Sequence, residues 1–213
     1  MFSLEFFINT LSLGSLYALF SLGLVIVYGI LQLVNFAYGE LVMISAYGFY
    51  WLATYLKLPF FVVIIFSVLL GGVVSVLTEV TAFRPVRNKS TVAIFATSFA
   101  VSMMLQNLVL ILVSPRARAV PLPNIFNKSV QLLGVVTPWR NILTIATTAL
   151  MLILISLLLK YTILGTAMRA ATNNFTASRL MGVPANLIIM LAFLLSGLLA
   201  GVSSIFWIGR SAS

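Results

Sequence analysis

Six apolar runs, each long enough to cross a bilayer as a helix, limit what this chain can fold into more than any motif does. A membrane-spanning helix needs about 20 mainly apolar residues. The runs are separated by gaps that hold Lys, Arg, Pro and Asn, and the predicted spans are residues 6–33, 36–56, 60–83, 92–113, 142–159 and 187–207. We therefore expect an all-α fold, a polytopic membrane helical bundle with about six transmembrane helices in this chain.

The residue types that the chain lacks narrow its chemistry. Hydrophobic residues make up 62% of the sequence and charged residues 7%, against roughly 25% charged in soluble domains, so the outer surface must face lipid. Neither Cys nor His is present, which removes most metal sites, thiol nucleophiles and Ser-His-Asp triads. The G-x-x-x-x-G-K-[ST] motif that cradles ATP phosphates is also missing. We predict that the chain is not an enzyme and holds no metal or cofactor.

The net charge of +9 is distributed as membrane proteins distribute it. The twelve Lys and Arg residues lie in the gaps between apolar runs, as expected of snorkelling anchors and topology signals. No basic stripe with interleaved aromatic residues occurs, so we expect a lipid bilayer around the chain and no nucleic acid as a partner. With six spans, six cations fall on each side of the membrane, and the positive-inside rule leaves the orientation open.

An amide, a phenol and a carboxylate stand together in the stretch NFAYGE, residues 35–40. A carboxylate in hydrocarbon costs a few kcal/mol, so such a Glu usually faces protein or water. Gly39 weakens a helix by roughly 1 kcal/mol relative to Ala. We interpret Asn35, Tyr38, Gly39 and Glu40 as candidates for lining a substrate path at a break between two helices. A short polar turn at the membrane interface, with Tyr38 in the aromatic belt, explains the same residues equally well.

Three further polar residues lie in or beside the predicted spans. We expect Glu79 to be a helix-end charge that pairs with the basic turn at residues 84–90. The adjacent amides Gln106 and Asn107 are expected to form hydrogen bonds between helices. A role in lining the path is the alternative for all three.

Small residues are spaced for close helix packing in three of the predicted spans, the first of which holds Gly14, Ser15 and Ala18. The sequence SGLLAG places Gly197 and Gly201 four residues apart, and Gly71 and Gly72 are adjacent in the third span. Such spacing lets two helix backbones approach closely. We interpret these glycines as packing within the bundle rather than as a dedicated dimer face.

The polar stretch between the fifth and sixth spans, residues 165–187, is predicted to hold a short amphipathic helix. Asn173 or Asn174 can cap its start, and Gly182 followed by Pro184 can end it. A helix of this length is marginal alone, so we expect its apolar side chains to dock into a groove on a partner. The alternative is a helix that lies on the chain's own membrane surface.

Two of these stretches resemble the LivH-type permeases, the membrane subunits of branched-chain amino acid ABC importers. GSLYALFSLGLVIVYGILQLVNFAYGELVMISAYGFYW, residues 14–51, resembles the amino-terminal signature of that family. GTAMRAATNNFTASRLMGVPANLIIMLAFLLSGLLAGVSSIF, residues 165–206, resembles its cytoplasmic loop followed by a span rich in small residues. The turn RPVR at residues 84–87 fits as well.

The resemblance implies a single permease transmembrane domain over residues 1–213, with NFAYGE on the translocation path and a cytoplasmic coupling-helix loop at residues 165–184. The residues implied to couple to a separate ATP-hydrolysing ABC subunit are Arg169, Asn174, Phe175, Ala177, Arg179 and Gly182. A second homologous permease subunit and an extracytoplasmic solute-binding protein are the other implied partners. The implied function is ATP-driven import of branched-chain or related amino acids across the cell inner (plasma) membrane.

The chain departs from the family pattern at three places. Tyr38 stands where the family commonly has His, and Thr176 replaces an acidic residue of the coupling loop. The chain stops at GRSAS, where members of the family continue with further spans. We therefore expect a C-terminally truncated or short member.

Three rival functions fit parts of the same sequence. A permease for urea or short amides would share the fold. An ATP-independent channel or ion-coupled carrier would use Glu40 as a proton-titrating group. A subunit of a respiratory-type complex would place Glu40 and Glu79 in a proton relay, although such relays usually need more carboxylates and often Lys or His within the spans.

Overall fold

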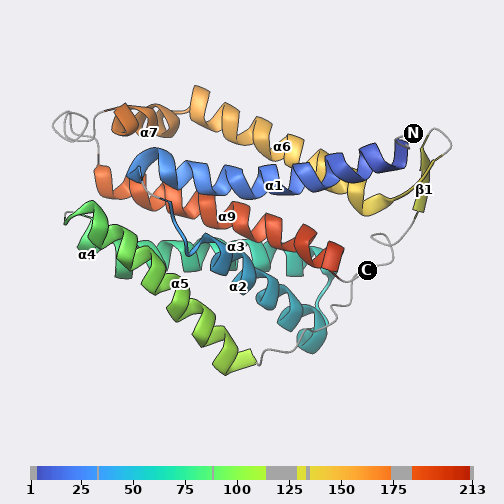
Figure 1. Ribbon diagram of the computed structural model, residues 1–213, viewed down its shortest axis with the longest axis horizontal. Coiled ribbons are helices and arrows are strands. Elements are labelled where there is room, and N and C mark those ends of the chain that lie inside the picture. The colour runs from blue at the N-terminus through green and yellow to red at the C-terminus, as the bar shows by residue number, and fades with distance from the viewer. Residues whose placement is uncertain are drawn as a thin grey trace.

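A computed structural model describes residues 4–32, 34–87, 89–113, 129–132, 135–173 and 184–211 of the protein. Over these residues the chain forms helices joined by short turns and one β-hairpin (Figure 1). In chain order the elements are α1 (Leu4–Leu31), α2 (Tyr38–Trp51), η1 (Leu52–Leu56), α3 (Phe60–Thr78), η2 (Glu79–Phe83), α4 (Arg84–Val86), α5 (Thr91–Val113), β1 (Ser129–Leu132), β2 (Val135–Pro138), α6 (Trp139–Tyr161), α7 (Ile163–Asn173) and α9 (Ala185–Ser211), where η marks a π-helical turn.

Five helical stretches of the described chain are long and apolar enough to cross a membrane. They are Leu4–Leu31, Phe60–Val86, Thr91–Val113, Trp139–Tyr161 and Asn186–Arg210. Each corresponds to a predicted span. The remaining predicted span, residues 36–56, is an α-helix of 14 residues, α2, which continues through the five-residue π turn η1. An all-α membrane bundle is confirmed, with a second span shorter than expected.

Helix α9 lies at the centre of the bundle, with α1 on one side and α2 and α3 on the other (Figure 1). α6 packs against α1, and α5 lies at the outer edge beside α2. One end of the molecule carries α4 and α7, and we call it the α4–α7 end. The opposite end carries the amino terminus, the end of α9 and the antiparallel hairpin β1–β2, and we call it the hairpin end.

α3 and α9 pack against each other along a seam of small residues. A Cβ atom added to Gly71 would stand 2.5 Å from the Gly197 carbonyl oxygen, and one added to Gly201 would stand 2.5 Å from the Val68 Cα atom. The Ser75 hydroxyl donates a hydrogen bond of 2.6 Å to the Phe193 carbonyl across the same seam. Packing within the bundle, predicted for these glycines, is therefore what the structure shows.

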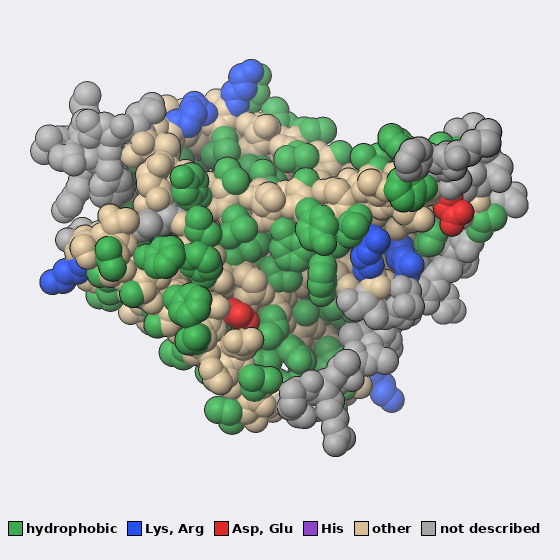
Figure 2. All heavy atoms as spheres, in the orientation of Figure 1, with side chains coloured by type: hydrophobic (Ala, Val, Ile, Leu, Met, Phe, Trp, Pro, Cys, Tyr) green, Lys and Arg blue, Asp and Glu red, His purple; other side chains and the backbone are tan. Residues whose placement is uncertain are grey.

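The outer faces of the bundle are apolar along most of their length. Large exposed side chains on α6 include Leu150, Ile153 and Leu157. Only 17% of an apolar 18-residue segment of this helix is buried inside the bundle. Figure 2 shows hydrophobic side chains over much of one face, with Lys and Arg side chains toward its two ends. A surface of this kind is stable in a bilayer rather than in water.

Candidate functional site

The chain between α1 and α2 leaves the helical conformation at Gln32. Gln32 has a φ of 55°, in the left-handed region that commonly terminates helices. Hydrogen bonds from side chains then replace those of a helix: Asn35 Oδ1 accepts from the Ala37 N–H over 3.1 Å, and Ser98 Oγ of α5 accepts from the Phe36 N–H over 2.7 Å. The predicted break between two helices is present, and these backbone groups are partnered as membrane depth requires.

The break lies well inside the bundle. Tyr38 packs against Gly23 of α1, which is eight residues from the end of that helix at Leu31, or about 12 Å along its axis. Ser102 donates a hydrogen bond of 3.2 Å to Glu40 Oε1 and is the middle residue of α5, about 17 Å from either end. Glu40 therefore lies at the mid-depth of a membrane-spanning helix, which favours a path over a turn at the interface.

The four candidate path residues fall into two environments. Asn35 and Tyr38 are buried, with 4% and 2% of their surfaces exposed. The Tyr38 hydroxyl lies beside Ser203 of α9 without a hydrogen bond of standard geometry. Gly39 is exposed in the first turn of α2, and Glu40 is partly exposed. Gly39 and Glu40 can therefore contact a solute, whereas Asn35 and Tyr38 hold the break in place.

Two serines of α5 that are not among the predicted path residues also belong to this site. Ser98 and Ser102 are four residues apart, so they share one face of α5. Ser98 bonds the break and Ser102 bonds Glu40. The signal that could have revealed them is the Ser-x-x-x-Ser spacing inside an apolar span, because hydroxyls in such spans usually bond neighbouring helices.

The surface around Glu40, formed by the break, α2 and α5, is here called the α2–α5 face. Its large exposed side chains include Phe36, Phe95, Phe99 and Met103. Gln106 and Asn107 are exposed further along α5. Asn107 Nδ2 donates over 2.7 Å to the Met103 carbonyl of its own helix, and the interhelical hydrogen bond expected of this amide stays a prediction. The α2–α5 face thus presents the Glu40 carboxylate and, one helical turn beyond Ser102, the Gln106 amide in an apolar surface.

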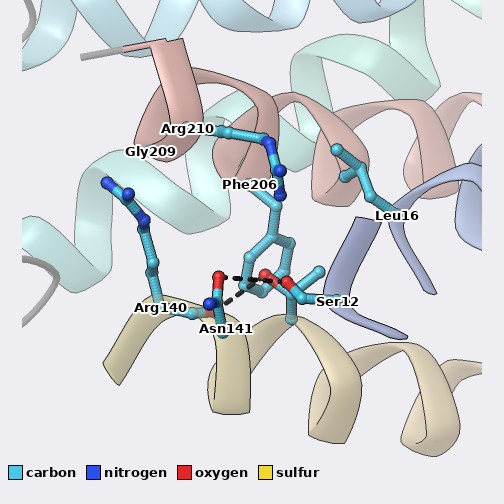
Figure 3. Close-up of a pocket in the computed structure, with 8 residues that line it drawn as sticks. Ser12, Leu16, Arg140, Asn141, Phe206, Gly209 and Arg210 are labelled. Carbon is cyan, nitrogen blue, oxygen red and sulfur yellow. Dashed lines mark hydrogen bonds between the residues drawn. The ribbon is translucent and has the colours of Figure 1, made fainter. Parts of the chain in front are cut away.

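A second polar cluster lines a cavity at the hairpin end, between α1, α6 and α9 (Figure 3). Its lining residues include Ser12, Arg140, Asn141, Thr144, Phe206 and Arg210. Asn141 Oδ1 accepts from the Ser12 hydroxyl over 3.2 Å, and Asn141 Nδ2 donates to Asn9 Oδ1. These bonds join α6 to α1 and satisfy the buried amide, so we interpret the cluster as structural.

Of the residues implied to couple to an ATPase, Arg169 lies within the described chain. The others, Asn174, Phe175, Ala177, Arg179 and Gly182, lie outside the described residues, as does the short helix predicted there. Arg169 is exposed on α7 and donates to the Leu159 carbonyl in the last turn of α6 and, over 3.2 Å, to the Thr166 hydroxyl. Its charge thereby stabilises the carboxyl end of α6, where the helix dipole favours a cation.

Glu79 pairs with the basic turn, as predicted. Its Oε1 lies 3.5 Å from Arg87 Nη1, and only 1% of Glu79 is exposed. The pair is therefore enclosed by the α4–α7 end of the bundle. Within the described ranges, no three acidic side chains gather as a metal site would require.

The chain is similar to known transport proteins over almost its whole length. The family model described as branched-chain amino acid transport system / permease component matches residues 6–211. BraD of Pseudomonas aeruginosa, a high-affinity branched-chain amino acid transport system permease protein, is 30% identical over 214 residues, which cover 95% of this chain and 69% of BraD. The LivH proteins of Salmonella typhimurium and Escherichia coli carry the same description and are 28% identical over 219 residues, covering 96% of this chain and 70% of LivH. No solved structure gives a significant match.

Proposed function

The chain belongs to the family of branched-chain amino acid transport system permeases, whose model spans residues 6–211, and from this premise we propose that it is the membrane-spanning subunit of an ATP-driven importer. It is a multi-pass protein of the cell inner membrane. The proposed cargo is a branched-chain or related amino acid. ATP hydrolysis belongs to a separate subunit, because the chain has no phosphate-binding loop of its own.

The observation that carries this proposal is the position of Glu40. A carboxylate at mid-membrane depth that faced lipid would cost a few kcal/mol or more, yet Glu40 is partly exposed beside Ser102. A water-filled path or a protein partner must therefore cover it. A zwitterionic amino acid offers an ammonium group to this carboxylate, and the neighbouring Phe99 and Met103 offer apolar surface to an aliphatic side chain.

The exposed amides of α5 support a second homologous permease subunit as a partner. Gln106 and Asn107 lie in a membrane-spanning helix and are exposed, and amides in such helices usually bond across to another helix. A paired subunit would cover these amides and enclose the solute path between two α2–α5 faces. The extracytoplasmic solute-binding protein would deliver the amino acid at the hairpin end.

We expect the α4–α7 end to lie in the cytoplasm. The sequence contains no Cys, so single cysteines report orientation directly. Ser90→Cys, in the exposed turn before α5, should react with a membrane-impermeant maleimide only after cells are permeabilised. Lys57→Cys, in the exposed turn before α3 at the hairpin end, should react in intact cells. The opposite labelling pattern would contradict both the orientation and the proposed contact of residues 165–184 with an ATPase.

The function is tested by reconstitution in proteoliposomes of the permease with its partner permease, its ATPase and its solute-binding protein. Uptake of labelled leucine, isoleucine or valine should require ATP on the ATPase side and should survive collapse of the proton gradient. Uptake that follows a proton gradient and ignores ATP would favour the ion-coupled carrier. Uptake of urea in place of leucine would favour the amide permease.

A further inference from the structure

Three side chains connect the start of α9 to the end of the helix that begins with α3. Glu79 is the first residue of η2, Arg87 follows α4, and Asn186 is the second residue of α9. The Glu79 carboxylate lies 3.5 Å from Arg87 Nη1, and Arg87 Nη2 donates a hydrogen bond to Asn186 Oδ1. We call these three residues the Glu79–Arg87–Asn186 latch.

Stability alone does not account for the latch. Only 2% of the Glu79 side chain and 11% of the Arg87 side chain are exposed. The loss of hydration on burying two charges offsets most of their attraction, so an apolar pair of similar volume is usually as stable or more so. A buried pair of charges does offer a connection with one defined geometry, which an apolar contact between flexible side chains does not.

The π turn aligns the latch with the α3–α9 seam. Four residues that contact α9 are Gly71, Ser75, Phe83 and Arg87, and together with Glu79 they recur at every fourth position along α3, η2 and the turn after α4. In an α-helix each step of four residues turns about 40° beyond a full turn. Side chains spaced four residues apart therefore rotate gradually around the helix and away from a straight neighbouring helix. The wider turn of η2 (Glu79–Phe83) offsets part of this drift. Phe83 thereby stays against Phe193 of α9, with ring centroids 5.2 Å apart.

The latch lies beside the proposed contact with the ATPase and in line with the candidate path. The loop proposed to meet the ATPase ends at residue 184, and Asn186 lies two positions further along the chain. From there α9 runs along the seam to Ala200, which packs in one buried cluster with Tyr38 at the start of α2. A displacement of the start of α9 can therefore reach the break through packed side chains, provided that α3 moves with it.

We propose that the Glu79–Arg87–Asn186 latch makes α3 and α9 move as one body, so that displacement of the coupling loop is transmitted to the break at Tyr38 and Glu40. This inference rests on the proposed function and specifies how its two sites communicate. The latch residues are positioning residues, because none of them is placed on the solute path. Their loss should uncouple ATP hydrolysis from transport rather than abolish either partner's binding.

The test uses the complete reconstituted transporter and measures leucine taken up per ATP hydrolysed. The double variant Glu79→Met/Arg87→Met replaces the charges by apolar side chains and should fold. The swap variant Glu79→Arg/Arg87→Glu keeps an ion pair, and the Asn186 amide can donate to the new carboxylate. Lys89→Met removes an exposed cation from the same turn and serves as the control.

The double variant should assemble and hydrolyse ATP while its uptake per ATP falls by about fivefold or more. The swap variant and Lys89→Met should stay close to the unmodified protein. An unchanged ratio in the double variant overturns the latch, and so does a swap variant that is no better than the double variant. Loss of folded protein in both variants also overturns it, because the pair is then only a structural element. Absence of ATP-driven uptake in the unmodified complex refutes the proposed function instead.

Discussion

Replacement of Gly197 by Leu is expected to leave little folded protein. A Cβ atom at this position would stand 2.5 Å from Ser75 Cβ and would press on the Gly71 backbone of α3. Neither neighbour can rotate away, so α3 and α9 must separate along the seam at the centre of the bundle. Overpacking alone costs about 1–3 kcal/mol, and loss of the packed seam adds to it. We expect the free energy of unfolding to fall by at least about 3 kcal/mol, a large part of the stability of an ordinary domain.

Gly14→Leu in α1 is the matched control. It makes the same change inside a helix, but nothing lies within 4 Å of the added Cβ atom, so the close packing predicted for Gly14 is wrong. Because Leu is about 0.8 kcal/mol more favourable than Gly in a helix interior, the control should be unchanged or slightly stabilised. Thermal unfolding of the detergent-solubilised proteins gives the comparison. Equal melting temperatures for the two variants would mean that the α3–α9 seam tolerates separation.

The sequence predicts the number and order of the spans well because run length is enough to recognise a helix in a bilayer. It also predicts the break after the first span, but not the interaction that keeps residues 34–37 out of a helix. Their conformation depends on Ser98 of α5, whose hydroxyl accepts the Phe36 N–H. That bond joins residues 62 positions apart, and no local pattern of hydrophobicity reveals it.

The candidate path was predicted as a stretch of sequence, and the structure divides it by environment. Tyr38 is buried because Gly23, fifteen positions earlier, leaves room for its ring. Glu40 is placed at the surface because it is two residues further along the first turn of α2, on a different side of the helix. Polarity identifies Asn35, Tyr38 and Glu40, and low helix propensity identifies Gly39. The side that each residue faces is set by the packing of α1 and α5. The coupling roles of Arg169 and of the residues beyond it remain predictions.

Glu40→Gln is expected to reduce leucine uptake by about tenfold or more while leaving the protein folded. The substitution keeps the shape of the side chain and an oxygen that can accept the Ser102 hydrogen bond. It removes the charge that we propose pairs with the ammonium group of the solute. A hydrogen bond to a charged group is worth ~1.5–3 kcal/mol, which corresponds to a decrease of about ten- to a hundredfold in affinity.

The measurement is the initial rate of uptake against leucine concentration in the reconstituted complex, with ATPase association and melting temperature recorded for each variant. Glu5→Gln removes an exposed carboxylate near the amino terminus and serves as the control. Because the loss acts on a contact with the solute, it should raise the concentration needed for half-maximal transport, and it should not lower the melting temperature. Uptake by Glu40→Gln that matches the Glu5→Gln control at every concentration would show that the carboxylate at mid-membrane depth is covered by a partner helix and does not line the path.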